Sequence, residues 1–191
     1  WSPTGNEEIL SMDEIIQQFD FDRVSNTGGI FDVKKLDWMN QQYITALPVE
    51  DCQAYIRNFL TDADLISEDY PDEKLRLITE TYQNRIEHFD QVPEMTKHLF
   101  ASAEELVYSD EAKDVLVTEQ AQMLVATFAD KVKASSFDED FAKGVVKEIQ
   151  KETGIKGKDL WFPVRAAVVG QTSGPNFINT LLSRGKEAVE S

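Results

Sequence analysis

The sequence has a single cysteine, Cys52, so it cannot form an internal disulfide. This residue has no CxxC partner, which excludes the common cysteine-based zinc sites, and we expect it to be a small buried helix residue. No apolar run approaches the roughly 20 residues that a membrane helix needs. The first residues also lack the basic start and apolar stretch of a signal peptide. We therefore expect a cytoplasmic chain without a membrane partner, whose fold depends on side-chain packing.

Motifs that carry catalytic chemistry are also missing. No GxGxxG or GxxxxGK[ST] loop is present to hold phosphates, and no HExxH pattern is present to bind zinc. The two histidines, His88 and His98, fall on separate predicted helices, which argues against a metal pair. The carboxylates include no isolated pair in apolar surroundings, the arrangement that shifts protonation for acid–base catalysis. We expect no catalytic residue, no metal site and no cofactor in this chain.

Basic residues are scarce: 19 Lys and Arg stand against 35 Asp and Glu, for a net charge of −16. Taken alone, this charge argues against a nucleic-acid partner, because Lys and Arg supply most non-specific affinity for phosphates. The charge is unevenly spread, however. Residues 143–186 carry eight basic and three acidic side chains, a local net charge of +5. This asymmetry fits a chain with one end facing a polyanion, although basic helix faces without a partner are common.

Apolar residues make up 41% of the chain and recur at helical spacing almost throughout. No window shows sustained period-two alternation, so we predict an all-α fold. A chain of 191 residues can hold one large domain or two small ones. The helical period lapses around residues 101–109, which predicts two consecutive helical domains, residues 1–103 and 104–191.

The clearest helix start lies at Ser11. Its hydroxyl can accept from the backbone of the following turn, and Glu14 three residues later completes a capping box. The apolar residues of this helix, which we expect to be buried, are Met12, Ile15, Ile16 and Phe19.

Capping and turn residues place the other helices. Asp32 is a suitable N-cap, and Pro48 fits the first turn of a helix because its missing amide is unpaired there. Pro93 restarts a short helix, and Gly154 is a normal C-terminal glycine. The expected helices are 32–47, 48–59, 75–86, 93–99, 110–133, 137–152, 158–169 and 175–185.

One segment, KGKDLWFPVRAAVVGQTSGPNF, combines features that a plain core helix avoids. It has a proline inside the helical run, Pro163, an arginine in apolar surroundings, Arg165, and the loop GQTSGP at residues 170–175. The glycines of this loop allow the backbone to approach a flat ligand closely. Arg165 can hydrogen-bond to or stack on an unstacked base, with Phe177 adding a face beside it. From these residues alone, a tight helix–helix turn with Arg165 in solvent fits equally well.

This segment, together with KLDWMNQQYI, resembles the C-terminal region of bacterial-type glutamyl-tRNA synthetases, which has a KLxWxNxxY helix and a PLRxALTGxxxGP-like motif. The resemblance covers the whole chain, including WSP at its start and SMDEIIQQFDFDRVS. It implies an elongated pair of helical domains that grips the anticodon arm of glutamate tRNA, in a monomer without a DNA partner. The HIGH and KMSKS motifs are missing, so ATP and Mg are expected in a separate catalytic domain.

The resemblance also implies roles for individual residues. It assigns contacts with the first two anticodon bases to Arg165 and to the loop and helix start. Other members have a threonine and a leucine in that loop, whereas this chain has Gly174 and Phe177. The residues assigned to these two bases are Arg165, Gly174, Pro175, Asn176 and Phe177.

Arg85, in YQNRIEHF, matches the position that reads the third anticodon base. Arginine there favours the cytosine of glutamate anticodons, because its planar donor fork can read a base edge. We therefore expect discrimination against glutamine tRNA. The alternative is an ordinary exposed helix arginine paired with Glu80 or Glu87.

Further polar residues are candidates for contacts with the tRNA backbone, which fix register without reading sequence. Trp38 is expected in the core, and Trp161 is expected to serve packing. The backbone candidates are Lys34, Lys35, Asn40, Lys156 and Lys158.

Two other functions remain open. A helical scaffold that binds protein explains the acidity without tRNA, and it predicts that changing Arg165 or Arg85 leaves RNA binding unaltered. A truncated synthetase paralogue with another RNA target is the second alternative, and the sequence upstream of Trp1 would decide it.

Overall fold

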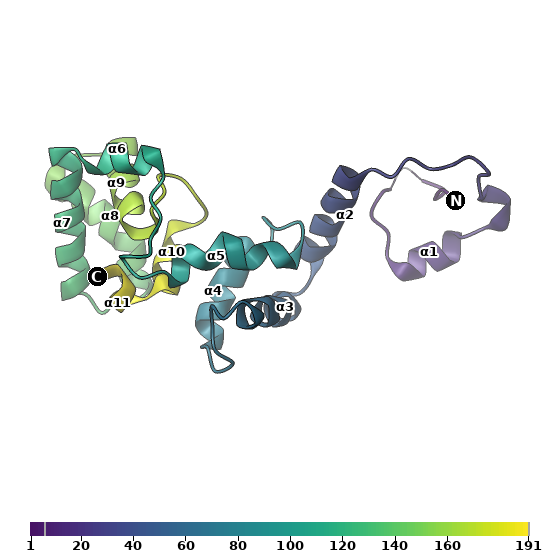
Figure 1. Cartoon of the computed structure of the whole chain (residues 1–191), viewed down its shortest axis with the longest axis horizontal. Helices are drawn as coiled ribbons and strands as arrows, with labels where there is room; N and C mark the ends of the chain where they lie inside the picture. The colour runs from purple at the N-terminus through teal and green to yellow at the C-terminus, as the bar shows by residue number, and fades with distance from the viewer. Residues whose placement is uncertain (6, 191) are drawn as a thin grey trace.

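The computed structural model describes residues 1–5 and 7–190, which form helices and loops with no strand among them. The molecule is elongated, with an N-terminal arm (the described residues before α2, which include α1) at one end and helices α6 to α11 at the other (Figure 1). The predicted all-α class is therefore confirmed. Within the described ranges, no helix has both the length and the apolar character required to cross a membrane. The helices are α1 (Met12–Gln18), η1 (Phe21–Arg23), α2 (Val33–Ala46), α3 (Val49–Asp62), α4 (Asp72–Tyr82), η2 (Phe89–Gln91), α5 (Val92–Phe100), α6 (Asp110–Leu116), α7 (Glu119–Ala134), α8 (Glu139–Thr153), α9 (Lys158–Val169), α10 (Phe177–Arg184) and α11 (Lys186–Glu190).

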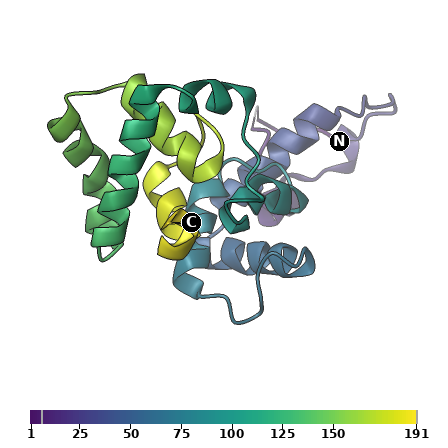
Figure 2. The same ribbon diagram turned by 60° about the vertical axis from the view of Figure 1, so that its left-hand side comes forward.

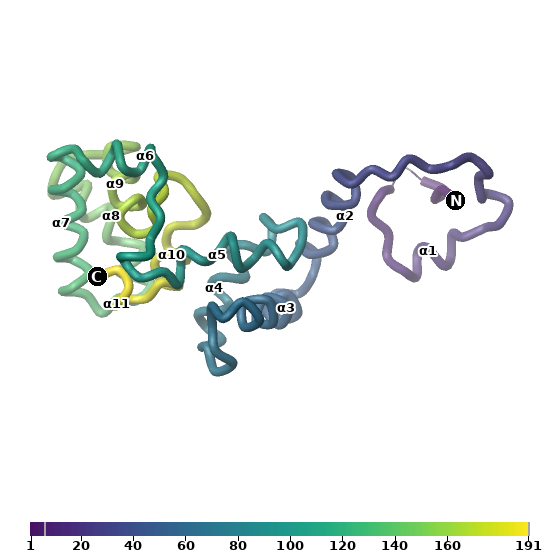
Figure 3. Tube along the Cα trace, viewed as in Figure 1, coloured from purple at the N-terminus to yellow at the C-terminus, as the bar shows by residue number. Residues whose placement is uncertain are grey.

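The N-terminal arm carries the capping box at Ser11 as predicted, with Glu14 accepting from the Ser11 amide at 2.7 Å. The predicted burial of its apolar stripe is wrong. Met12 is 69% exposed and Ile16 66% exposed, and Phe19 is also exposed. The trace in Figure 3 gives the reason: α1 stands apart from the other helices, so no second layer covers it.

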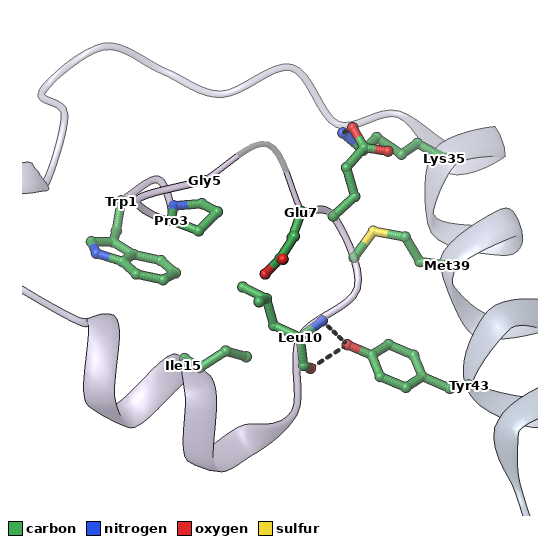
Figure 4. A pocket seen from close by; sticks show the side chains of 10 residues that line it. Trp1, Pro3, Gly5, Glu7, Leu10, Ile15, Lys35, Met39 and Tyr43 are labelled. Carbon is green, nitrogen blue, oxygen red and sulfur yellow. Dashed lines mark hydrogen bonds and ion pairs between the residues drawn. The ribbon is translucent and has the colours of Figure 1, made fainter.

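The arm is attached to α2 (Figure 4). The Tyr43 hydroxyl donates to the Leu10 carbonyl at 2.7 Å and accepts from the Leu10 amide at 3.3 Å. Lys35 pairs with Glu8 at 2.6 Å. Helix α2 therefore joins the arm to the remaining helices.

Two separate groups of buried side chains form the cores. The first comes from α2 to α5 and the segments between them, and the second from α7 to α10. Cys52 is fully buried in the first group as expected, and burial raises the pKa of its thiol to about 11. Trp38 was expected in the core, but it is 40% exposed.

The two groups are in contact, since α10 packs against both α4 and α5 (Figure 2). The boundary between residues 1–103 and 104–191 falls between the two cores and stays a prediction. The helix expected over residues 110–133 is broken into α6 and α7. Thr118 causes the break by accepting from the Ala121 amide at 3.2 Å, which caps α7.

Candidate nucleic-acid interface

The end of α9 is fixed by Gly170, which has the left-handed φ of +73°. Its amide donates to the Ala166 carbonyl at 2.8 Å, and its carbonyl accepts from the Ser109 amide at 2.9 Å. A Cβ at this position would lie 2.3 Å from the Val107 carbonyl oxygen. Only glycine fits there, and the loop at residues 170–176 is thereby held against the linker before α6.

Two polar contacts fix the loop and the start of α10. The buried Thr172 hydroxyl donates to the Glu111 carboxylate. The Asn176 side chain caps α10, accepting from the Ile178 amide at 2.9 Å. The helix therefore begins at Phe177, two residues later than expected. An exposed Gly174 lies beside the Arg165 guanidinium.

The Arg165 side chain contacts the loop at residues 170–176 and the first residue of α10. Its Nη1 donates to the Pro175 carbonyl at 3.0 Å, and its guanidinium carbon lies 5.2 Å from the centre of the Phe177 ring. A Cβ on Gly174 would come within 3.2 Å of the same Nη1. This arrangement excludes a freely solvated Arg165 and gives its guanidinium a defined orientation.

Phe177 does not offer a free face for a base. It is only 5% exposed, and the edge-to-face Trp161 ring lies 5.7 Å from it. The expectation that Phe177 adds a stacking face beside Arg165 is therefore not met by this structure. Its ring supports the guanidinium instead, and Trp161 serves packing as expected while remaining 41% exposed.

Arg85 lies in the turn after α4 and is exposed. Burial is the main cause that lowers the pKa of Arg165. Tyr82 acts in the opposite direction, and the positive charge of Arg85 adds a smaller lowering. Burial raises the pKa of Tyr82 to about 12, against the charges of Arg85 and Arg165. The charges of the two predicted base readers thus both act on Tyr82, on the side of α4 against which α10 packs.

Neither reader has an acidic partner among the residues that the structure describes. The alternative of an Arg85 paired with Glu80 or Glu87 is not observed, since Glu80 pairs with Arg76 at 2.9 Å. Guanidinium groups without carboxylate partners, in a chain of net charge −16, are each suited to an anion or to a base edge.

The other candidates lie elsewhere. Lys34 and Lys35 are at the start of α2, and Asn40 donates to the Glu87 carbonyl. Asn40 thus joins α2 to a neighbouring segment. Lys156 precedes α9 and Lys158 begins it, about two helical turns before Arg165 on the same side. Whether any of these residues touches tRNA stays a prediction.

The half-buried His98, which the sequence analysis considered only for a metal pair, lies beside Tyr82. Its Nε2 lies 3.3 Å from the Tyr82 hydroxyl, and Arg184 donates to the His98 carbonyl. Burial, followed by the Arg184 charge, lowers the pKa of His98 to about 4. The sequence indicated only that it lies on the short helix expected over residues 93–99.

This shift predicts an acid-labile fold. The native state accommodates His98 in its neutral form, so His98 contributes its full stability above the unfolded pKa of about 6.5. This stability is lost as the pH falls through the folded pKa of about 4, because the unfolded chain takes up a proton more readily. The loss is about 3 kcal/mol of unfolding free energy between pH 7 and pH 4. Urea unfolding of the wild type and His98→Gln at both pH values measures it. The wild type should lose more stability than the variant, and equal losses would refute the assignment.

Comparisons with known proteins fit this geometry. The family described as an anticodon binding domain matches residues 48–191. The chain is 37% identical over 190 residues to the glutamate–tRNA ligase of Finegoldia magna and 38% identical over 193 residues to that of Bacillus pumilus, with 99% of the chain covered in both. It spans only 38% and 40% of the lengths of these relatives.

Solved structures share the fold. A glutamate tRNA ligase from Elizabethkingia meningosepticum matches with a TM-score of 0.86 at 24% identity, over 100% of this chain and 37% of that one. A glutamate-tRNA synthetase from Elizabethkingia anophelis matches with a TM-score of 0.79 at 25% identity, over 99% of this chain and 36% of that one.

Proposed function

The chain belongs to the family of anticodon binding domains, and from that premise we propose that it recognises the anticodon of glutamate tRNA on behalf of a longer glutamate–tRNA ligase. The observation that carries the proposal is Arg165, whose guanidinium is fixed against the Pro175 carbonyl and the Phe177 ring and, like that of the exposed Arg85, has no acidic partner within the described residues. The relatives named above are glutamate–tRNA ligases, which supports glutamate tRNA as the partner.

The mechanism is positioning. The first two anticodon bases dock at Arg165 and at the backbone of Gly174, Pro175 and Asn176, and the third base docks at Arg85. A planar guanidinium suits this role because it can read a base edge or stack on an unstacked base. Phe177 contributes by holding Arg165. ATP, magnesium and the ligation step belong to the catalytic part of the longer protein, and this chain supplies no catalytic residue.

The partner and setting follow from this proposal. We assign the chain to the cytoplasm as a monomer that binds RNA and not DNA. The net charge of −16 makes binding of the isolated chain weak and strongly dependent on salt. The same acidity is the one observation that favours a protein-binding scaffold, which predicts no dependence on Arg85 or Arg165.

Arg85 is expected to discriminate at the third anticodon base. Glutamate tRNA transcripts with cytosine there should bind about 5- to 100-fold more tightly than transcripts with guanine, because one good base-edge contact is worth about 1–3 kcal/mol. Arg85→Gln should erase this preference. A titration at low salt with both transcripts measures it.

Arg76→Gln is the matched control for this experiment. Like Arg85→Gln, it removes one positive charge. Arg76 lies on α4 and is already paired with Glu50 and Glu80, so it is not available to read a base. Its third-base preference should equal that of the wild type. If both variants keep the preference, or if the wild type has none, Arg85 is a surface residue and the claim of discrimination is lost.

A further inference from the structure

The segment that carries Arg85 has no regular structure of its own between α4 and η2. Arg85 is exposed within it, whereas the next residue, Ile86, is fully buried in the first core. A guanidinium on an irregular segment is placed only as well as its neighbours hold that segment. The contacts of residues 83–88 therefore decide where Arg85 lies.

One side chain of this segment caps the end of α2. The buried Gln83 amide donates to the Ile44 and Leu47 carbonyls, both at 2.9 Å. The last carbonyls of a helix have no partner within it, so Gln83 satisfies groups that would otherwise be unpaired. The beginning of the segment is thereby fixed to the end of α2.

The rest of the segment is held by one face of α2. Asn40 donates to the Glu87 carbonyl, and Gln41 donates to the Asn84 carbonyl at 3.4 Å. Asp37 Oδ1 lies 2.8 Å from His88 Nε2. The spacing of Asp37, Asn40 and Gln41 puts them on one side of the helix, together with Ile44. We name Asp37, Asn40 and Gln41 the α2 clamp.

The residues that the clamp holds lie on both sides of Arg85 in the sequence, and the clamp makes no hydrogen bond with the Arg85 side chain within the described residues. It holds residues 84, 87 and 88, two of them through backbone carbonyls, and the Arg85 side chain stays exposed. The same helix carries Tyr43, which binds the N-terminal arm. The position of Arg85 is therefore tied to α2 and, through it, to the arm.

We propose that the α2 clamp, with His88, is a set of positioning residues that sets third-base discrimination by placing Arg85. This inference rests on the proposed function, because it requires that Arg85 reads the third base. This positioning role differs from the contact with the tRNA backbone that the sequence analysis expects for Asn40. A contact with a tRNA phosphate strengthens binding of every transcript equally, whereas a clamp acts only on the preference for cytosine over guanine.

The test is a titration of the cytosine and guanine transcripts against Asn40→Ala, Arg85→Gln and the double variant. Asn40→Ala should lower the preference by about twofold to tenfold, the effect of one lost hydrogen bond, and leave affinity for the guanine transcript unchanged. In the double variant, the preference should equal that of Arg85→Gln alone, because Asn40 acts through Arg85. Gln42→Ala is the control, since Gln42 lies on the same helix and makes no side-chain hydrogen bond within the described residues. Urea unfolding confirms that each variant is folded.

The outcomes separate the two proposals. If Arg85→Gln erases the preference and Asn40→Ala leaves it intact, the clamp is refuted and the anticodon reader stands. An Asn40→Ala variant that weakens both transcripts equally also refutes the clamp, because that pattern indicates a phosphate contact. If Arg85→Gln itself has no effect, the proposed reader fails and the clamp fails with it.

Discussion

A Gly170→Ala variant is expected to lose more than about 3 kcal/mol of unfolding free energy, because it combines left-handed backbone strain with a steric clash. The φ of Gly170 is +73°, and an added Cβ would lie 2.3 Å from the Val107 carbonyl oxygen and 3.0 Å from its carbonyl carbon. These are backbone atoms, which cannot rotate away as a flexible side chain can. Urea unfolding of the two proteins measures the loss.

The chain offers a matched control for this prediction. Gly154 ends α8 with the same φ of +73°, but no atom lies within 4 Å of its added Cβ. Gly154→Ala should therefore cost only the strain, about 1–2 kcal/mol. The difference between the unfolding free energies lost by the two variants measures the contact of Gly170 with Val107, in the segment before α6. Equal losses would show that this contact does not hold the loop.

An Arg165→Ala variant is expected to weaken binding of glutamate tRNA by about 10- to 100-fold, as the loss of one good base contact predicts. Arg165→Lys should recover only part of this affinity, because an ammonium lacks the planar donor fork. Both variants also lose the contacts with Pro175 and Phe177, so their unfolding must be measured beside their binding. A titration at low salt gives the affinities.

Lys158→Ala is the control for Arg165→Ala. It removes one positive charge from the same helix, about two turns away. Its affinity should fall by less than that of Arg165→Ala and equally for all anticodons, since a phosphate contact carries no sequence information. If Arg165→Ala binds like the wild type, Arg165 is a structural clamp for α10 and takes no part in recognition.

Local sequence signals predicted most of the helices. The capping box at Ser11 and the bounds of α9 agree with the structure because they depend on residues that are neighbours in the chain. The break at Thr118 was missed since apolar residues keep their helical spacing through α6 and α7. A threonine fits either a helix interior or a cap, and its neighbours decide which.

Burial was harder to predict. Helical periodicity identifies an apolar face, but it does not say whether another element covers that face. Met12 and Ile16 share such a face and remain exposed, because the arm stands apart from the other helices. Phe177 shows the opposite case: the sequence indicated an aromatic ring beside Arg165, but only the packing of Trp161 and Arg165 shows that its faces are occupied.

The residues of the candidate site come from resemblance and stay a prediction, and the contacts between them could not be predicted from the sequence. Arg85 and Arg165 are distant in the sequence. Arg165 contacts Pro175 and Phe177 at the start of α10, and α10 packs on α4, the helix that precedes Arg85. The roles of Tyr82 and Gln83 were missed for the same reason. Each fits the pattern of an ordinary helical residue, and their importance comes from contacts between elements.

The most direct test of the account is a titration of the chain against the isolated anticodon stem-loop of glutamate tRNA and the same stem-loop with all three anticodon bases replaced. Both should be measured at one low salt concentration, since affinity depends on salt. The account predicts that the glutamate stem-loop binds more tightly, and that Arg165→Ala and Arg85→Gln each reduce the difference. Equal affinity for the two stem-loops would contradict anticodon recognition, and the absence of binding to either would favour a scaffold for protein partners.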